Sequence, residues 1–188
     1  MILPTLSLAT DDTDLFVVGY LDGGDRAVAY NPKTDGSLRI SMSQGGPDLM
    51  RRVVSHYFTA GWEVANIDCK DQTEGRSQLF HLRQSMTSRN PDNPMVVVIE
   101  DLTSLTYAHP YSTGTGEHTP SGANNAQLVE QLTLGRKYGV AVVSSQWPRA
   151  GFVATRDVKP GRVYITGSPD RCFWNDSGRT HGPFEAAV

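Results

Sequence analysis

The fold class of this chain is decided by one stretch, Met95-Val96-Val97-Val98-Ile99-Glu100-Asp101. Its first five residues are all apolar, and they are β-branched from Val96 on, which predicts a strand that is covered on both faces. Strands of that kind belong to sheets that carry helices on both sides. Residues 140–145 and 162–166 are predicted to be further buried strands.

Helical patterns alternate with these strands. After Pro47, which suits a first helical position, apolar residues from Leu49 to Phe58 recur at helical spacing and predict one buried helical face. Further helices are predicted over 78–88 and 125–138, and a short one is expected to begin at Ser168-Pro169-Asp170. This alternation predicts an α/β fold, with a mainly parallel sheet and helices on both faces.

The amino-terminal part reads differently. Residues 15–21 and 26–30 flank Asp22-Gly23-Gly24-Asp25, a turn sequence that predicts a β-hairpin. Two more strands are predicted, over 37–42 and 63–68. We expect residues 1–14 to form an amino-terminal arm and residues 15–188 a single domain, because this length suffices for one core. Residues 103–124 are expected to be a long loop, of a length that points to function or disorder. It contains no Lys or Arg, so an interface role or plain mobility suits it better than binding phosphates.

Composition excludes several classes of protein. Hydrophobic residues make up 38% of the 188 residues and charged residues 20%, which excludes a disordered chain. No apolar run approaches the roughly 20 residues that a membrane span needs, and the start lacks the basic segment of a signal peptide. We therefore expect a cytoplasmic protein with no membrane partner. The net charge of −3 gives no overall basic surface for nucleic acid, so any DNA contact must come from a local patch or from several subunits.

Candidate catalytic residues follow two of the predicted strands. Ligands of open α/β sheets bind at the carboxyl ends of the strands. In P-loop ATPases a carboxylate there holds the Mg²⁺ shell and a neighbouring acid orients the attacking water, so Glu100 and Asp101 are candidate catalytic and metal residues. Gln146 is a candidate sensor of the γ-phosphate or of that water. The alternative interpretations are two solvated acids and a polar residue that ends a strand.

The candidate nucleotide-binding residues lie between a predicted strand and a helix: Ser43, Gln44, Gly45, Gly46 and Asp48. A phosphate-binding loop has the pattern G-x-x-x-x-G-K-[ST], in which Lys neutralises charge and the hydroxyl binds Mg²⁺. No Gly-Lys dipeptide occurs in this chain, and in register Gly46 takes the place of Lys and Pro47 that of Ser/Thr. The helix amino end still favours an anion, but the expectation that ATP and Mg²⁺ bind is weakened.

Five motifs, in order, resemble the motor domain of FtsK/HerA-type DNA translocases, including TraB-like DNA-transfer proteins. They lie at residues 21–31, 60–70, 96–102, 135–148 and 162–176, so the resemblance covers most of the chain. It implies a RecA-like P-loop NTPase core, rings that include hexamers, and work on double-stranded DNA. It also implies that Arg136 acts as an arginine finger on a neighbouring subunit's nucleotide; a solvated arginine near a helix end is the alternative. The sequence departs from the family at the missing Lys and Ser/Thr, and at Glu100-Asp101, which reverses the family's Asp-Glu.

Three functions remain open on these grounds. The favoured one is a motor-fold protein of a DNA translocation or transfer system, of a phage or mobile element. It would have lost or impaired ATPase activity and serve as an assembly or binding subunit, in its own ring or with an active homologue. The first alternative is an active, small ATP-dependent DNA translocase with an atypical phosphate loop. The second is an α/β domain that binds another small molecule at the same sheet edge. The missing Lys favours the assembly or binding subunit over the two alternatives.

Overall fold

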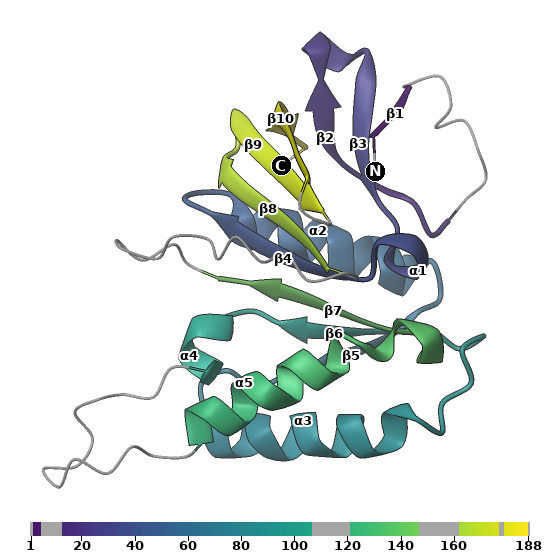
Figure 1. Ribbon diagram of the computed structural model, residues 1–188, viewed down its shortest axis with the longest axis vertical. Coiled ribbons are helices and arrows are strands. Elements are labelled where there is room, and N and C mark those ends of the chain that lie inside the picture. The colour runs from purple at the N-terminus through teal and green to yellow at the C-terminus, as the bar shows by residue number, and fades with distance from the viewer. Residues whose placement is uncertain (1, 5–12, 107–120, 147–161, 177–178, 188) are drawn as a thin grey trace, which may run out of the picture.

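The computed structural model describes residues 2–4, 13–106, 121–146, 162–176 and 179–187. Within these ranges ten strands form one sheet, in the order β1-β3-β2-β10-β9-β8-β4-β7-β6-β5. Figure 1 shows helix α2 behind this sheet and helices α3, α4 and α5 on the side nearer the viewer and below. None of the helices in the described ranges is long and apolar enough to cross a membrane.

The elements have the following bounds. The strands are β1 (Ile2–Pro4), β2 (Phe16–Leu21), β3 (Arg26–Tyr30), β4 (Ser37–Met42), β5 (Glu63–Asn66), β6 (Met95–Ile99), β7 (Val140–Ser145), β8 (Arg162–Ser168), β9 (Arg171–Asp176) and β10 (Arg179–Ala186). The α-helices are α1 (Pro32–Asp35), α2 (Gly46–Thr59), α3 (Gln72–Met86), α4 (Leu102–Thr106) and α5 (Ser121–Leu132), and the 3₁₀ turns are η2 (Asp22–Gly24) and η3 (Gly135–Tyr138).

The central strand β6 explains why both faces of the sheet are covered. Val96 and Val98 pack into one core with α2, whereas Val97 and Ile99 pack into a second core with α3 and α5. Successive side chains of a strand point to opposite faces, so an unbroken apolar run supplies both cores. The predicted helices on both faces are therefore confirmed.

The sheet is mixed, and the prediction of a mainly parallel sheet was wrong. Strands β8, β4, β7, β6 and β5 are parallel, but every pairing from β1 to β8 in the sheet order is antiparallel. Parallel neighbours need a crossover, usually a helix, whereas antiparallel neighbours need only a tight turn. The helix expected from Ser168 is absent: β8 ends there, and a two-residue turn leads into β9. In β9 the buried side chains of Cys172 and Trp174 alternate with more exposed ones, the period of a strand.

Other boundaries shift in the predicted helices. Helix α3 begins six residues before the expected start at 78, because Asp71 accepts hydrogen bonds from the amides of Thr73 and Glu74 and so caps it. The helix expected over 125–138 is α5 followed by the separate turn η3. Within the expected loop 103–124, residues up to Thr106 belong to α4, residues from Ser121 on belong to α5, and 107–120 lie outside the described residues.

The amino-terminal hairpin forms as predicted and lies in the antiparallel part of the sheet. β2 pairs with β3 and also with β10, through Tyr20 with Glu185 and Gly19 with Ala186. Part of the expected arm, Ile2–Pro4, is the strand β1 and pairs with β3, whereas residues 5–12 lie outside the described residues.

Candidate functional site

The polar residues that follow β4, β6 and β7 share one edge of the sheet. These three strands are parallel neighbours, so their carboxyl ends lie on the same side, to the left in Figure 1. The Gln146 amide donates to the Ile40 carbonyl of β4 at 2.9 Å, and the Ser145 hydroxyl donates to the Glu100 carbonyl after β6. The structure thus brings residues 43–46, the acid pair and Gln146 to one side of the sheet.

The connection between β4 and α2 has three residues, Ser43, Gln44 and Gly45. Gly45 has a left-handed backbone (φ 70°) and precedes the first turn of α2, which no side chain caps. Ser43 turns back to the neighbouring strand, because its amide donates to the Gly167 carbonyl at 2.9 Å. Asp48, in the first turn, forms an exposed ion pair with Arg51 at 2.9 Å.

A phosphate-binding loop would have to begin inside β4. When Gly45 is placed at the second glycine of G-x-x-x-x-G-K-[ST], the first glycine falls at Ile40. Ile40 is buried and pairs with Ser145 of β7 on one side and with Ile165 of β8 on the other. Its position in the ladder between two strands keeps this part of the backbone extended, so it cannot curl around a phosphate group.

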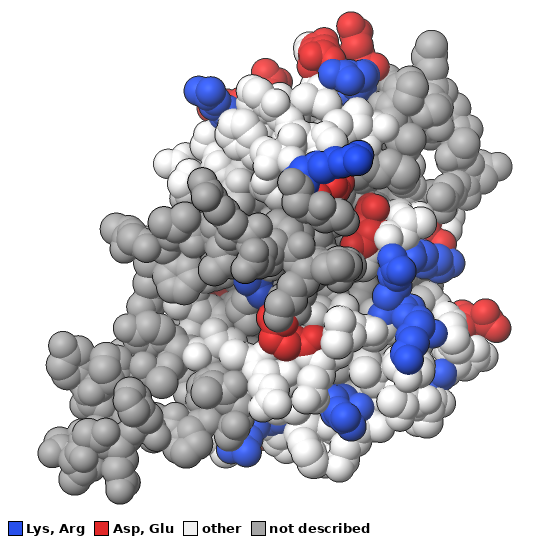
Figure 2. All heavy atoms as spheres, in the orientation of Figure 1, with Lys and Arg blue, Asp and Glu red and all other residues white. Residues whose placement is uncertain are grey.

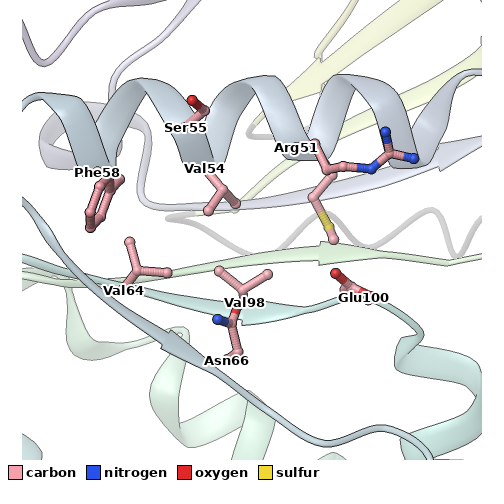
Figure 3. A pocket seen from close by; sticks show the side chains of 9 residues that line it. Arg51, Val54, Ser55, Phe58, Val64, Asn66, Val98 and Glu100 are labelled. Atoms are coloured by element: carbon pink, nitrogen blue, oxygen red, sulfur yellow. The ribbon is translucent and has the colours of Figure 1, made fainter.

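The two acids after β6 have different surroundings. Asp101 caps α4: its carboxylate accepts from the Ser104 amide at 3.0 Å and from the Ser104 hydroxyl at 2.5 Å. Glu100 is exposed, and none of the described residues forms an ion pair with it. Its side chain lines a pocket beneath α2 together with Val98 and Arg51 (Figure 3). In this structure Glu100 is therefore the acid whose carboxylate is available to a ligand.

Cys69 lies close to the same turn. Burial raises the pKa of its thiol, the amides of Asp101 and Glu100 oppose that rise, and the two acid charges add to it. The thiol therefore stays protonated at neutral pH, which agrees with the sequence giving it no base. Among the described residues, no group of three or more His, Cys, Asp or Glu side chains is placed to hold a metal ion.

Arg136 lies on the opposite side of the sheet from the carboxyl ends of the strands. It belongs to η3, which precedes β7, and its guanidinium donates to the Thr34 carbonyl of α1 at 2.7 Å. Arg136 therefore lies at the amino ends of the parallel strands, and the candidate site lies at their carboxyl ends. An action on a nucleotide held by the same subunit is excluded by this placement; the role on a neighbouring subunit stays a prediction.

The surface charge is mixed on the face drawn in Figure 2. Lys and Arg side chains form one group on the right, near α1, and are otherwise separated by uncharged and acidic residues. Lys33 of α1 is itself paired with Asp14 at 2.5 Å. The described residues of this face therefore form no continuous basic stripe of the kind that follows a DNA backbone.

A groove beside the edge strand β5 was missed by the sequence reading. Phe58, predicted on the buried face of α2, is 69% exposed there, and Val64 and Asn66 of β5 line the groove with it. The groove depends on β5 being the last strand of the sheet, which no local sequence pattern encodes. A helical wheel that separates Phe58 from Leu49, Val53 and Tyr57 was the available signal.

Solved structures with similar folds include a conjugation coupling protein and a type VII secretion ATPase. The chain resembles the pCW3 conjugation coupling protein TcpA, solved as a monomer with ATPγS, with a TM-score of 0.65, 13% identity and coverage of 94% of this chain and 66% of that one. It also resembles the cytoplasmic domain of the type VII secretion ATPase EccC of Thermomonospora curvata, with a TM-score of 0.64, 13% identity and coverage of 99% and 28%. ATPases 2 and 3 of EssC from Geobacillus thermodenitrificans match with a TM-score of 0.59, 10% identity and coverage of 92% and 44%.

These likenesses establish the fold alone: the chain shares the α/β fold of these structures. The chain spans less than two thirds of the length of each of these structures. No family model matches it, and no curated protein matches its sequence.

Proposed function

We propose that this chain is a motor-fold subunit of a DNA translocation or transfer system that has lost ATP hydrolysis and works by binding and assembly. What supports the proposal is the connection between β4 and α2. It has three residues where a phosphate loop needs more, Ile40 stands in a strand where the loop would begin, and neither Lys nor Ser/Thr follows Gly45. Loss of the cation and the Mg²⁺-binding hydroxyl costs roughly 3 kcal/mol or more of phosphate stabilisation.

The alternative is an active ATP-dependent translocase in which Glu100 and Gln146 act at the carboxyl edge. It is favoured by the convergence of these residues at that edge and by TcpA, whose structure was solved with ATPγS. Asp101 would have to leave Ser104 before it could act on a metal or on water. In either case, Glu100 is the residue we assign to any Mg²⁺ that binds here, because its carboxylate is exposed and unpaired among the described residues.

Titration of ATP with Mg²⁺ into the purified chain, followed by calorimetry, separates the two functions. We expect no binding up to about 1 mM ATP, because a Kd of 1 mM corresponds to only about −4 kcal/mol and the main phosphate contacts are missing. The double variant Gly46→Lys/Pro47→Ser tests the loop itself. We expect it to bind no better, since the loop remains too short. Micromolar binding by the unchanged chain that Glu100→Gln weakens would instead establish the active translocase.

The assembly part of the proposal is tested without nucleotide. Light scattering gives the mass of the chain alone, and fluorescence anisotropy with a 30-base-pair duplex tests DNA binding at several salt concentrations. We expect an oligomer whose affinity for DNA falls steeply with salt, since contacts to phosphates release counterions. A monomer that does not bind the duplex would leave DNA handling without support.

A further inference from the structure

A groove lies between α2 and the last strand of the sheet, and Glu100 stands at one end of it. Its volume is about 530 Å³, and its lining is mostly apolar. Figure 3 shows Phe58 and Val54 of α2 facing Val64 and Val98 of the sheet across the opening, with Glu100 at one end. Phe58 is 69% exposed, so a large aromatic ring stands at the rim with most of its surface in water.

Strand β5 lines the groove, and no described strand pairs with its outer side. β5 is the last strand of the sheet and pairs only with β6 among the described strands. The Glu63 amide donates to the carbonyl of Pro94, the residue before β6, and the Ile67 amide donates to the Val98 carbonyl of β6, each at 2.9 Å. Amides along a strand point alternately to its two sides, so the backbone groups of Val64 and Asn66 point out of the sheet. The side chains of these two residues also line the groove. One bound segment could therefore pair with the outward backbone groups and contact the apolar surface.

We propose that this groove binds an extended segment of a protein partner, which adds a strand to β5, inserts apolar side chains between Phe58 and Val64, and places a Lys or Arg beside Glu100. Strand addition is a general mode of peptide recognition in which main-chain hydrogen bonds give affinity and pockets for alternate side chains give specificity. The inference rests on the proposed function as an assembly subunit and names the class of partner that such a subunit would hold.

The charge of the groove selects the partner. Arg51 forms an exposed ion pair with Asp48, so among the described residues that line the groove the charge without an ion-pair partner is the Glu100 carboxylate. A basic residue of the partner would complement it, and an acidic one would be repelled. A second copy pairing through its own β5 fits less well, because Glu63-Val64-Ala65-Asn66 offers no cation to Glu100.

The first test selects peptides from a displayed library of random 12-residue sequences on the purified full chain. We expect enrichment of sequences in which apolar residues alternate with polar ones and a Lys or Arg lies at one end. A synthetic peptide of the most enriched sequence is then measured by fluorescence anisotropy. Phe58→Ala should weaken its binding roughly tenfold or more, as loss of an aromatic anchor does, whereas Phe80→Ala is the matched control, because Phe80 is a 48% exposed ring on α3 outside the groove.

Two further variants separate strand addition from simple apolar contact. Asn66→Pro removes an amide that points away from β6 and leaves the hydrogen bonds to β6 in place. It should therefore lower the affinity for the peptide severalfold. Glu100→Lys, at an exposed position, should reverse the preference between the peptide and its twin in which Lys or Arg is replaced by Glu. Amide hydrogen exchange followed by NMR should show protection of the Val64 and Asn66 amides when the peptide binds.

Four results would overturn the proposal. The first two are a selection that enriches no peptide and peptide binding that Phe58→Ala and Glu100→Lys leave unchanged. The other two are a peptide that binds as a helix and leaves the Val64 and Asn66 amides unprotected, and a dimer of the chain that Phe58→Ala dissociates. None of these readouts uses nucleotide or DNA. ATP hydrolysis by the chain would therefore refute the proposed function while leaving the peptide result standing, and a failed peptide selection would leave the calorimetric result standing.

Discussion

At the scale of single residues, Glu100 and Asp101 show that the hydrogen bonds of a carboxylate decide whether it is available to a ligand. Asp101 satisfies the Ser104 amide and hydroxyl and so begins α4. We expect Asp101→Ala to lower the free energy of unfolding by about 1 kcal/mol, the usual cost of a lost helix cap. Asp101→Asn should lose much less, since Asn caps almost as well as Asp. Urea unfolding followed by circular dichroism measures both variants.

Glu100 supplies the matched control for this prediction. Its carboxylate is exposed and holds no ion pair among the described residues, so Glu100→Gln should stay within about 0.5 kcal/mol of the unchanged chain. A loss at Glu100 as large as that at Asp101 would show that the Glu100 carboxylate makes a stabilising contact and would contradict the prediction.

At the scale of elements, α3 is fixed by a close approach at Gly75. A Cβ there would lie 2.3 Å from the Asp68 carbonyl oxygen and 2.7 Å from Leu105 Cδ1. Helix propensity alone predicts that Gly75→Ala stabilises a helix by about 1 kcal/mol. We expect the opposite sign, a loss on the order of 2 kcal/mol in urea unfolding, because the clash is with backbone and forces α3 away from the β5–α3 connection.

The control for Gly75 is Gly46, the first residue of α2. A Cβ at Gly46 would make ordinary contacts, 3.5 Å from Ile40 Cγ2 and 3.6 Å from Met42 Cβ. Gly46→Ala should therefore change stability by less than about 1 kcal/mol. Equal losses in the two variants would show that the α3 approach is not what makes Gly75 costly to replace.

The elements also show what local sequence can and cannot predict. Strands β4, β6 and β7 were predicted with their observed bounds, since burial on one or both faces is written directly into their residues. β9 was missed because Ser168-Pro169-Asp170 imitates a helix start, and the choice of strand depends on pairing with β8. At the site, the convergence of the strand ends was implied by the predicted α/β fold, because the carboxyl ends of parallel strands lie on one side of the sheet. The groove did not, because it needs β5 to be the edge and Phe58 to be left uncovered.

At the scale of the whole molecule, the antiparallel half and the parallel half share one core. Phe184 of β10 is 2% exposed and packs in the same cluster as Val53 of α2 and Val96 of β6. It also seals the contact between β10 and β2, where Gly19 leaves room for it: a Cβ at Gly19 would lie 2.5 Å from Phe184 Cδ2. This shared core is the physical ground for expecting residues 15–188 to unfold as one domain.

We therefore expect Phe184→Ala to lower the free energy of unfolding by about 3–4 kcal/mol and to do so for both halves at once. Two probes follow the halves in urea: the fluorescence of Trp174 in β9, with Trp62 and Trp147 replaced by Phe, and the circular dichroism of the helices. In a single cooperative unit both transitions move to the same lower urea concentration. Phe80→Ala, at an exposed ring on α3, should move neither by more than a small amount. A shift of the Trp174 transition alone would divide the chain into two units, with the hairpin and β8–β10 in one and α3 and α5 in the other.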